Sequence, residues 1–178
     1  MANARTTKAA KAPVNDVAES KATVRKFEPT EPIECVSVTA GRLMMIGRKT
    51  GNLYDWMNCG DTAYVEYQDL KAEMLVANSP IMYDPMILIN DPEVYSCPEF
   101  AKLSGVYKDA LTAEEIDEFF NLPVQQFGSK LKKLPKGIQN TIKSIAAEKL
   151  ENGTLDSINK IKILDATLGT DLYNLLVR

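Results

Sequence analysis

The chain has 178 residues, of which 45% are hydrophobic and 25% charged, and its formal net charge is −3. A chain of this size and composition buries one core, or two small cores that share an interface. The longest aliphatic runs, LMMI at 43–46 and MILI at 86–89, are far shorter than the roughly 20 residues that a membrane helix needs. We therefore expect a globular body without a membrane helix.

The N-terminal segment differs from the rest of the chain in charge. Residues 1–26 carry six Lys or Arg against two Asp or Glu, which leaves +4 on this segment and −7 on the body. Residues 1–31 show no apolar period that would offset the entropy of ordering them. We predict a basic arm, extended or disordered, that contacts nucleic acid or an acidic protein surface. The candidate contact residues in this arm are Arg5, Lys8, Lys11, Arg25 and Lys26.

Short strands separated by turn residues follow the arm. The strand-like segments IECVSVT, RLMMIG, LYDWM and TAYVEY alternate with turns about every eight to eleven residues between Ile33 and Tyr67. This spacing predicts an antiparallel β-meander of three or four strands. A sheet this small needs a helix on its open face.

The segment QDLKAEMLVANSP supplies that helix, with an apolar stripe of Leu70, Met74, Leu75 and Ala77 and a stop at Asn78 to Pro80. MILIN at 86–90 then reads as a short buried strand. Asp91 followed by Pro92 has the form of a helix start. We therefore predict a β-rich unit with a covering helix over residues 32–105.

Helices fill the remainder, residues 106–178. In LTAEEIDEFF, Thr112 is placed to cap a helix while Glu115 reaches back to it. Three more apolar stripes follow at helical spacing. Their residues are Val124, Phe127, Leu131 and Leu134; then Ile138, Ile142, Ile145 and Leu150; then Ile158, Ile161, Leu164 and Leu168. The predicted fold class is α+β: an extended arm, a small antiparallel β-meander with a covering helix, and a C-terminal α-helical bundle.

The absence of histidine from the chain removes several kinds of catalytic and metal site. Ser-His-Asp triads, Cys-His pairs and histidine metal ligands all require it. Neither common glycine-rich phosphate loop occurs, and the glycines of TAGRLMMIGRKTG at 39–51 suit hairpin turns better than nucleotide binding. We predict no cofactor, no metal and no enzymatic activity. Carboxylate chemistry is the alternative, with Asp55, Asp61, Glu66 and Asp69 as the available acids.

Cys35, Cys59 and Cys97 are odd in number and widely spaced, which indicates neither a disulfide framework nor a zinc site. A reducing compartment fits this pattern. Cys59 lies in the turn NCGD, but its nearest basic residue in sequence is Lys49. A nucleophilic thiolate needs such a neighbour close by, so we favour a small apolar turn residue.

The run KLKKLPK at 130–136 is the basic segment of the folded part, and Lys130, Lys132 and Lys133 are candidates for contact with nucleic acid or a partner. The competing interpretation is the solvated face of an amphipathic helix whose leucines face the core. Aromatic residues gather earlier in the chain. Tyr54, Trp56 and Tyr64 are candidates for a subunit interface, with the core as the alternative for Trp56.

Three segments carry a resemblance to a known class of proteins: GRLMMIGRKTGNLYDWMNCGDTAYVEYQDL, YDPMILINDPEV and LPKGIQNTIKSIAAEKLENGTLDSINKIKILDATLGTDL. Over about residues 33–172 the order of elements resembles that of small virion proteins of tailed bacteriophages. The resemblance implies a structural or accessory component of the head, neck or tail. It also implies repeated copies, bound to other virion proteins in a symmetric assembly. It carries no site residues, since it has no catalytic signature.

The first functional hypothesis is therefore a non-enzymatic structural protein of a tailed-phage particle, made in the host cytoplasm and located in the virion. It binds other virion proteins through its arm and its folded body. The alternative is a soluble nucleic-acid-binding or regulatory protein that uses the basic arm and Lys130 to Lys136. An enzyme that uses carboxylates alone is a third hypothesis.

Overall fold

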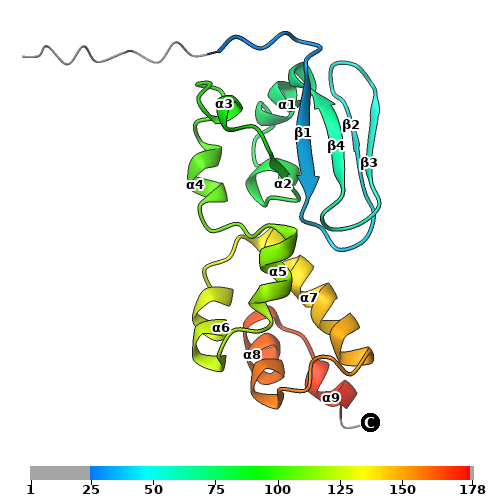
Figure 1. The fold of residues 1–178 in the computed structure, drawn as a ribbon, viewed down its shortest axis with the longest axis vertical. Helices are drawn as coiled ribbons and strands as arrows, with labels where there is room; N and C mark the ends of the chain where they lie inside the picture. The colour runs from blue at the N-terminus through cyan, green and yellow to red at the C-terminus, as the bar shows by residue number, and fades with distance from the viewer. Residues whose placement is uncertain (1–24, 177–178) are drawn as a thin grey trace, which may run out of the picture.

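A computed structural model of the chain describes residues 25–176 (Figure 1). It confirms the α+β class: a β-rich half with short helices lies above a half made of helices alone. The described strands are β1 (Pro32–Ser37), β2 (Leu43–Ile46), β3 (Leu53–Trp56), β4 (Thr62–Glu66) and β5 (Ile87–Ile89). The described helices are α1 (Tyr67–Met74), α2 (Pro80–Tyr83), α3 (Pro92–Tyr95), α4 (Leu103–Tyr107), α5 (Ala113–Phe119), α6 (Val124–Leu131), α7 (Lys136–Glu151), α8 (Ile158–Leu168) and α9 (Leu172–Leu176).

The strands are antiparallel, as predicted, but their pairing order differs from that of a simple meander. β1 lies between β4 and β5 in a three-stranded sheet, while β2 and β3 pair with each other as a separate hairpin. The turn before β4 explains the difference. Gly60 N–H donates to the Ser37 carbonyl at 2.8 Å, and Ser37 N–H donates to the Asp61 carbonyl at 2.9 Å. These bonds draw β4 alongside β1, so the hairpin between them in sequence is set to one side, next to β4 (Figure 1).

The core of the β-rich half combines both sheets with the short helices. Trp56 is 1% exposed, and its indole N–H donates to the Cys35 carbonyl at 2.9 Å. This bond ties the inner face of the hairpin to the central strand of the sheet. The buried residues of this core are Ile33, Cys35, Leu43, Met45, Tyr54, Trp56, Val65, Tyr67, Leu70, Met74, Met82, Ile87, Ile89, Val94, Cys97, Phe100 and Leu103.

The predicted covering helix forms as α1 but ends at Met74, earlier than its apolar stripe suggests. Leu75 is 80% exposed and Ala77 is also exposed, so neither belongs to the buried face. Beyond Leu75 the chain turns, with Asn78 at a φ of +57°, and the Ser79 hydroxyl donates back to the Glu73 carboxylate. Asp91 begins α3 as predicted, because its carboxylate accepts the N–H of Glu93 at 2.9 Å.

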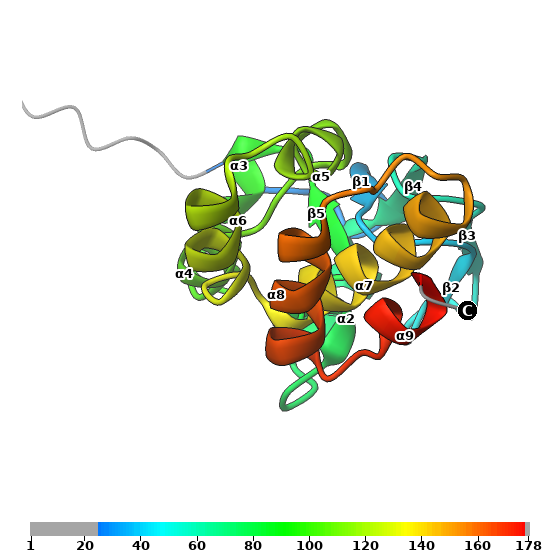
Figure 2. The ribbon, with the colours of Figure 1, turned by 90° about the horizontal axis from the view of Figure 1, so that it is seen from below.

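The helical half has its own core, and its first helix begins as predicted. Thr112 and Glu115 form a reciprocal capping box at the start of α5. Figure 2 shows α7 packed beside α8 and α9, and α6 beside α8. The buried residues of this core are Val38, Leu111, Ile116, Phe119, Phe120, Phe127, Leu131, Leu134, Ile138, Ile142, Ala146, Leu155, Ile161, Leu164 and Leu172. The predicted stripes supply seven of these fifteen residues. Four other stripe residues are only half-buried, namely Val124, Ile145, Leu150 and Leu168, and the stripe prediction is wrong for Ile158, which is 48% exposed.

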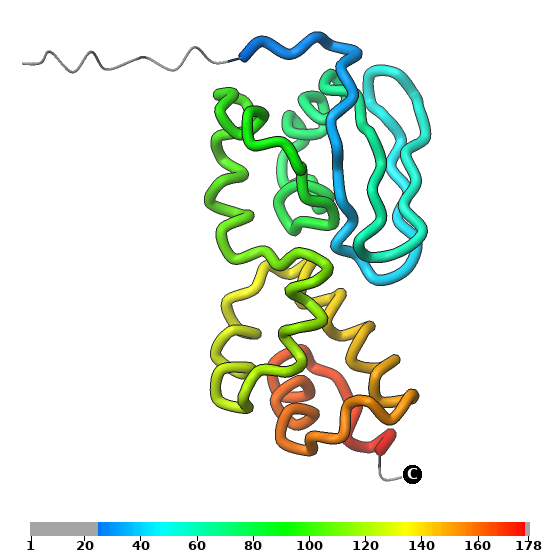
Figure 3. Tube along the Cα trace, viewed as in Figure 1, coloured from blue at the N-terminus to red at the C-terminus, as the bar shows by residue number. Residues whose placement is uncertain are grey.

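The two halves meet through direct contacts at the start of α7. Val38, just after β1, is buried in the helical core, and its carbonyl accepts the Thr141 hydroxyl at 2.6 Å. Gly137 packs so closely on the 84–85 backbone that a Cβ at this position would collide with the carbonyls of Asp84 and Pro85. The trace in Figure 3 shows the two halves stacked along the long axis of the molecule.

The end of the predicted arm belongs to the body. The guanidinium of Arg25 pairs with Glu93 at 2.8 Å and with Glu31, and the Phe27 ring stacks on Tyr67 at 4.9 Å between centroids. Tyr67 N–H also donates to the Glu31 carbonyl at 2.9 Å. Within the predicted arm, residues 25–31 therefore contact the body through an ion-pair network and an aromatic stack. Residues 1–24 lie outside the described part of the chain.

Candidate functional site: the outer face of the β2–β3 hairpin

The hairpin of β2 and β3 carries exposed apolar side chains on its outer face. Alternation along the strands points Leu43, Met45, Tyr54 and Trp56 inward, and the residues between them point to solvent. We call the outward apolar set the hairpin patch. It consists of Met44, Ile46, Leu53 and Met57, which are 55%, 68%, 59% and 58% exposed.

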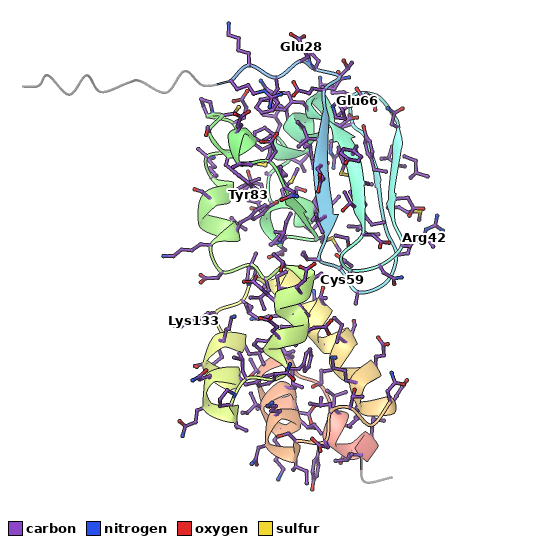
Figure 4. All side chains as sticks on the ribbon, in the orientation of Figure 1. Glu28, Arg42, Cys59, Glu66, Tyr83 and Lys133 are labelled. Atoms are coloured by element: carbon purple, nitrogen blue, oxygen red, sulfur yellow. The ribbon has the colours of Figure 1, made fainter. Side chains whose placement is uncertain are left out.

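The register of the hairpin concentrates this patch. Ile46 lies directly opposite Leu53, so the two side chains are cross-strand neighbours. Met44 lies opposite Asp55, whose carboxylate accepts two bonds from Arg42, at 2.9 and 2.7 Å. These bonds from Arg42 lower the pKa of Asp55 below its ordinary value. Figure 4 shows Arg42 projecting from the outer side of the hairpin. The pair of Arg42 with Asp55 therefore lies on the same outer face, between Leu53 and Met57 along the chain, while Ile46 and Leu53 form an apolar pair near the loop.

One edge of the hairpin is also open. Among the described strands, β2 pairs with β3 alone, so its other edge has no strand partner. Free backbone N–H and C=O groups along such an edge are a template for another extended chain. The open edge of β2 adjoins the exposed side chains of Met44 and Ile46.

The loop of the hairpin is held by a buried carboxylate on α1. Asp69, which is 1% exposed, accepts four hydrogen bonds. The donors are Lys49 N–H at 2.7 Å, Thr50 N–H at 3.2 Å, the Thr50 hydroxyl at 2.6 Å and the Tyr54 hydroxyl at 2.8 Å. Burial by itself raises the pKa of Asp69, but the bonds from Thr50, Lys49 and Tyr54 outweigh it and leave the pKa below its ordinary value.

A second carboxylate, one helical turn further along α1, holds the start of the same loop. Glu73, 3% exposed, pairs with the guanidinium of Arg48 and accepts the Ser79 hydroxyl. Gly47 approaches so closely that a Cβ there would collide with the carboxylate of Asp69. The loop is therefore fixed to α1 through Arg48, Lys49 and Thr50, and the hairpin presents its patch from a rigid support.

The aromatic residues predicted for an interface are not those of the patch. Trp56 and Tyr54 are buried in the core, 1% and 8% exposed, so the interface prediction is wrong for both. Tyr54 and Trp56 are two residues apart on β3, so both point to the inner face of the hairpin and both rings are covered. Tyr64 is exposed, but it lies on β4 opposite Glu34, on the outer face of the three-stranded sheet. The patch residues were missed, although the same alternation that buries Trp56 exposes Leu53 and Met57.

The predicted basic contact residues fall into three groups. Arg5, Lys8 and Lys11 lie outside the described residues. Arg25 is engaged by Glu93, Glu31 and the Phe27 ring, and 47% of its side chain remains exposed. The remaining candidates are all exposed: Lys26, Lys130, Lys132 and Lys133.

Each acid named for carboxylate chemistry has a structural partner. Asp61 accepts the N–H groups of Met57 and Asn58 at 2.9 Å and so shapes the NCGD turn. Glu66 accepts the amides of Asn52 and Gln68, while Asp55 and Asp69 are engaged as described above. Within residues 25–176, no three Cys, Asp or Glu side chains are grouped as a metal site would require.

Cys59 is half-buried at the boundary between the two halves (Figure 4). Burial raises the pKa of its thiol, and the acids Asp117 and Glu114 raise it further. These surroundings are the opposite of those that activate a nucleophilic cysteine.

A hollow of about 460 Å³ lies between the outer face of the three-stranded sheet and the start of α5. Val36 and Leu88 are on its sheet side. Its two tyrosines already donate their hydroxyls to backbone carbonyls, Tyr95 to Ile89 and Tyr107 to Ile87. The hydroxyls of both tyrosines are therefore already engaged within the protein.

Comparison of the chain with models of protein families, with curated proteins and with solved structures finds no match. In the described part of the chain, no helix has both the length and the apolar character that crossing a bilayer requires.

Proposed function

We propose that this chain is a non-enzymatic assembly protein that binds a protein partner through the hairpin patch. The setting that the resemblance suggests is the virion of a tailed bacteriophage, with several copies of the chain bound to other virion proteins. The observation that carries the proposal is the exposure of Met44, Ile46, Leu53 and Met57 on one face of a fixed hairpin.

The energetics favour a protein partner for this face. Burying apolar surface contributes about 25 cal/mol per Å², and methionine is enriched at protein interfaces. The clamp from Asp69 and Glu73 orders the loop before any partner arrives. A preordered surface loses less conformational entropy on binding, so more of the burial free energy is retained as affinity.

The open edge of β2 adds a second element of recognition. A partner that places an extended segment along β2 gains backbone hydrogen bonds, while its side chains reach Met44 and Ile46. The proposed docking role of the arm rests on its sequence alone, since residues 1–24 are outside the described part of the chain.

The first experiment measures the amount of the chain in purified phage particles by quantitative mass spectrometry. The proposal expects a fixed number of copies per particle, in a ratio to the major capsid or tail protein that the particle symmetry allows. Absence from washed particles that are otherwise complete would overturn the proposal.

The second experiment alters the patch without altering the core. The double substitution Ile46→Lys and Leu53→Glu places opposite charges at directly paired positions, which avoids repulsion between the strands. Incorporation into particles is expected to fall at least about tenfold. The matched control is Leu75→Lys with Ile158→Glu, two exposed apolar residues outside the patch. Equal loss in the control, or full incorporation of the patch variant, would count against the hairpin patch as the binding surface.

A further inference from the structure

A second surface, on the helical half, has a charge opposite to that of the body as a whole. Residues 119–147 contain five lysines and no acid, whereas the chain carries 24 acids and a net charge of −3. All five of these lysines are exposed. Three of them, Lys130, Lys132 and Lys133, lie around the end of α6, and Lys108 follows α4. We call these four residues the lysine surface.

The fold brings these lysines together from distant parts of the sequence. Lys108, Lys130 and Lys133 line one hollow of about 190 Å³, and Figure 4 shows Lys133 on the outer side of the helical half. Asp109 and Glu115 line the same hollow, but the Glu115 carboxylate is committed to the capping box with Thr112. Three amines thus converge on a space in which one of the two acids is already engaged.

The lysine surface lacks the internal partners that other cations of the protein have. Lys71 pairs with Glu99, Lys149 with Asp117 and Arg42 with Asp55. None of the four lysines of the lysine surface lies within 4.0 Å of a carboxylate of the described residues. Their positive potential is therefore available to an external anion.

The residues around the lysines decide which kind of anion fits. Phe127, Leu131 and Leu134 point into the core and are buried, so this face offers no apolar anchor. Protein interfaces centre on such anchors, and helices that lie on membranes insert them into the bilayer. The neighbouring side chains on α6 are instead hydrogen-bonding ones, namely Gln125, Gln126 and Ser129. Lysines mixed with Gln and Ser are typical of contacts to phosphate oxygens.

We propose that the lysine surface binds the phosphate backbone of nucleic acid without reading its sequence. Binding of this kind comes from counterion release when lysines neutralise phosphates, and it weakens steeply as salt is added. The phenylalanines of α5 and α6 are buried in the core, so they make no base stacking here. This surface is separate from the hairpin patch and involves different residues.

The test uses the full chain and a fluorescein-labelled DNA duplex of arbitrary sequence, followed by fluorescence anisotropy between about 50 and 200 mM NaCl. Lys130→Gln with Lys133→Gln is expected to weaken binding roughly tenfold or more. It should also reduce the salt slope by about two, one for each phosphate that a lysine no longer neutralises.

The matched control is Lys49→Gln with Lys71→Gln, which removes the same charge from exposed positions of the β-rich half. It is expected to leave affinity within about twofold, because a change in net charge far from the phosphates weakens binding less than removal of a direct phosphate ligand.

Four results would overturn the proposal. The first is no binding of duplex by the native chain at low salt, and the second is equal weakening by both lysine pairs. The third is loss of all binding in Arg5→Gln, Lys8→Gln, Lys11→Gln with no effect of Lys130→Gln, Lys133→Gln, which would assign binding to the arm. The fourth is equal or tighter binding of labelled poly-glutamate or phosphatidylserine vesicles. The variant Ile46→Lys, Leu53→Glu should bind duplex normally. The test of nucleic-acid binding by the lysine surface is therefore independent of the test of partner binding by the hairpin patch.

Discussion

At the scale of single residues, Asp69 shows how one buried carboxylate positions a surface that it does not touch. It accepts bonds from two backbone N–H groups and two hydroxyls, and every donor belongs to the hairpin or its loop. Asp69→Asn replaces an acceptor oxygen by an amide that has no acceptor to bind. We expect a loss of about 2–4 kcal/mol in the free energy of unfolding at pH 7, measured by urea titration.

The pH dependence of this effect has a definite sign. The pKa of Asp69 in the folded protein lies below its ordinary value, so the carboxylate stabilises the fold above about pH 4. That contribution is lost as the pH falls through the folded pKa. The difference in the free energy of unfolding between the native chain and Asp69→Asn should therefore become smaller below about pH 4. Asp55→Asn, which removes a partly exposed partner of Arg42, serves as the control and should lower the free energy of unfolding much less than Asp69→Asn does. A difference in unfolding free energy between the native chain and Asp69→Asn that does not change with pH would contradict this prediction.

Cys59 gives a second prediction at this scale. Burial, Asp117 and Glu114 all raise the pKa of its thiol, and Cys35 and Cys97 are buried. In the folded protein at about pH 8 we expect all three to react with a disulfide reagent more slowly than an exposed cysteine. Unfolding in urea should release three fast equivalents, which provides the control. One fast thiol in the folded state would show that Cys59 is activated.

At the scale of elements, the junction between the halves depends on Gly137. A Cβ there would meet the carbonyls of Asp84 and Pro85, which are backbone atoms and cannot rotate away. Gly137→Ala should therefore destabilise the protein by about 1–3 kcal/mol, although alanine is the better helix former by about 1 kcal/mol. The measurement is the urea midpoint with its slope.

Gly105 in α4 is the matched control for this substitution. A Cβ at Gly105 meets no atom within 4 Å, so Gly105→Ala should be neutral or stabilising by up to about 1 kcal/mol. Equal effects at both glycines would mean that helix propensity, and not the close approach to residues 84 and 85, governs position 137.

The elements that sequence predicts well are those specified by local chemistry. The capping box of Thr112 and Glu115 and the Asp91–Pro92 start each need only a few adjacent residues, and both form. The end of α1 was missed because a bond beyond the helix decides it: the Ser79 hydroxyl reaches back to Glu73 and closes the turn at Asn78. The pairing of β1 with β4 was missed for a similar reason, since it depends on hydrogen bonds between Ser37 and the 60–61 turn.

At the scale of the whole molecule, the candidate surface was harder to predict than the fold. Tyr54 and Trp56 were predicted for an interface because they are large aromatic residues, but both are buried in the small core of the β-rich half. The exposed positions carry Met, Ile and Leu, residue types that sequence reasoning assigns to the interior. Side chains alternate between the two faces of β3, so one set faces the core and the other faces solvent. Which set faces solvent can be assigned only once one residue of the strand is known to be buried.

The last prediction separates folding from assembly by comparing the two faces of this strand pair. Trp56→Ala removes a side chain that is 1% exposed together with its bond to the Cys35 carbonyl. It should cost about 3–5 kcal/mol of unfolding free energy. Ile46→Lys with Leu53→Glu changes only exposed groups and should alter stability by less than about 1 kcal/mol.

Both variants should fail to enter particles, but for different reasons that thermal unfolding can distinguish. The Trp56 variant should melt well below the native chain, while the patch variant should melt near it and still remain outside the particle. If the patch variant also has a much lower melting temperature than the native chain, the outer face contributes to folding, and its failure to enter particles does not indicate a lost partner contact. If the Trp56 variant melts normally, the inner face is not the core that the buried side chains describe. Only the combination of a stable fold with failed incorporation assigns Met44, Ile46, Leu53 and Met57 to binding.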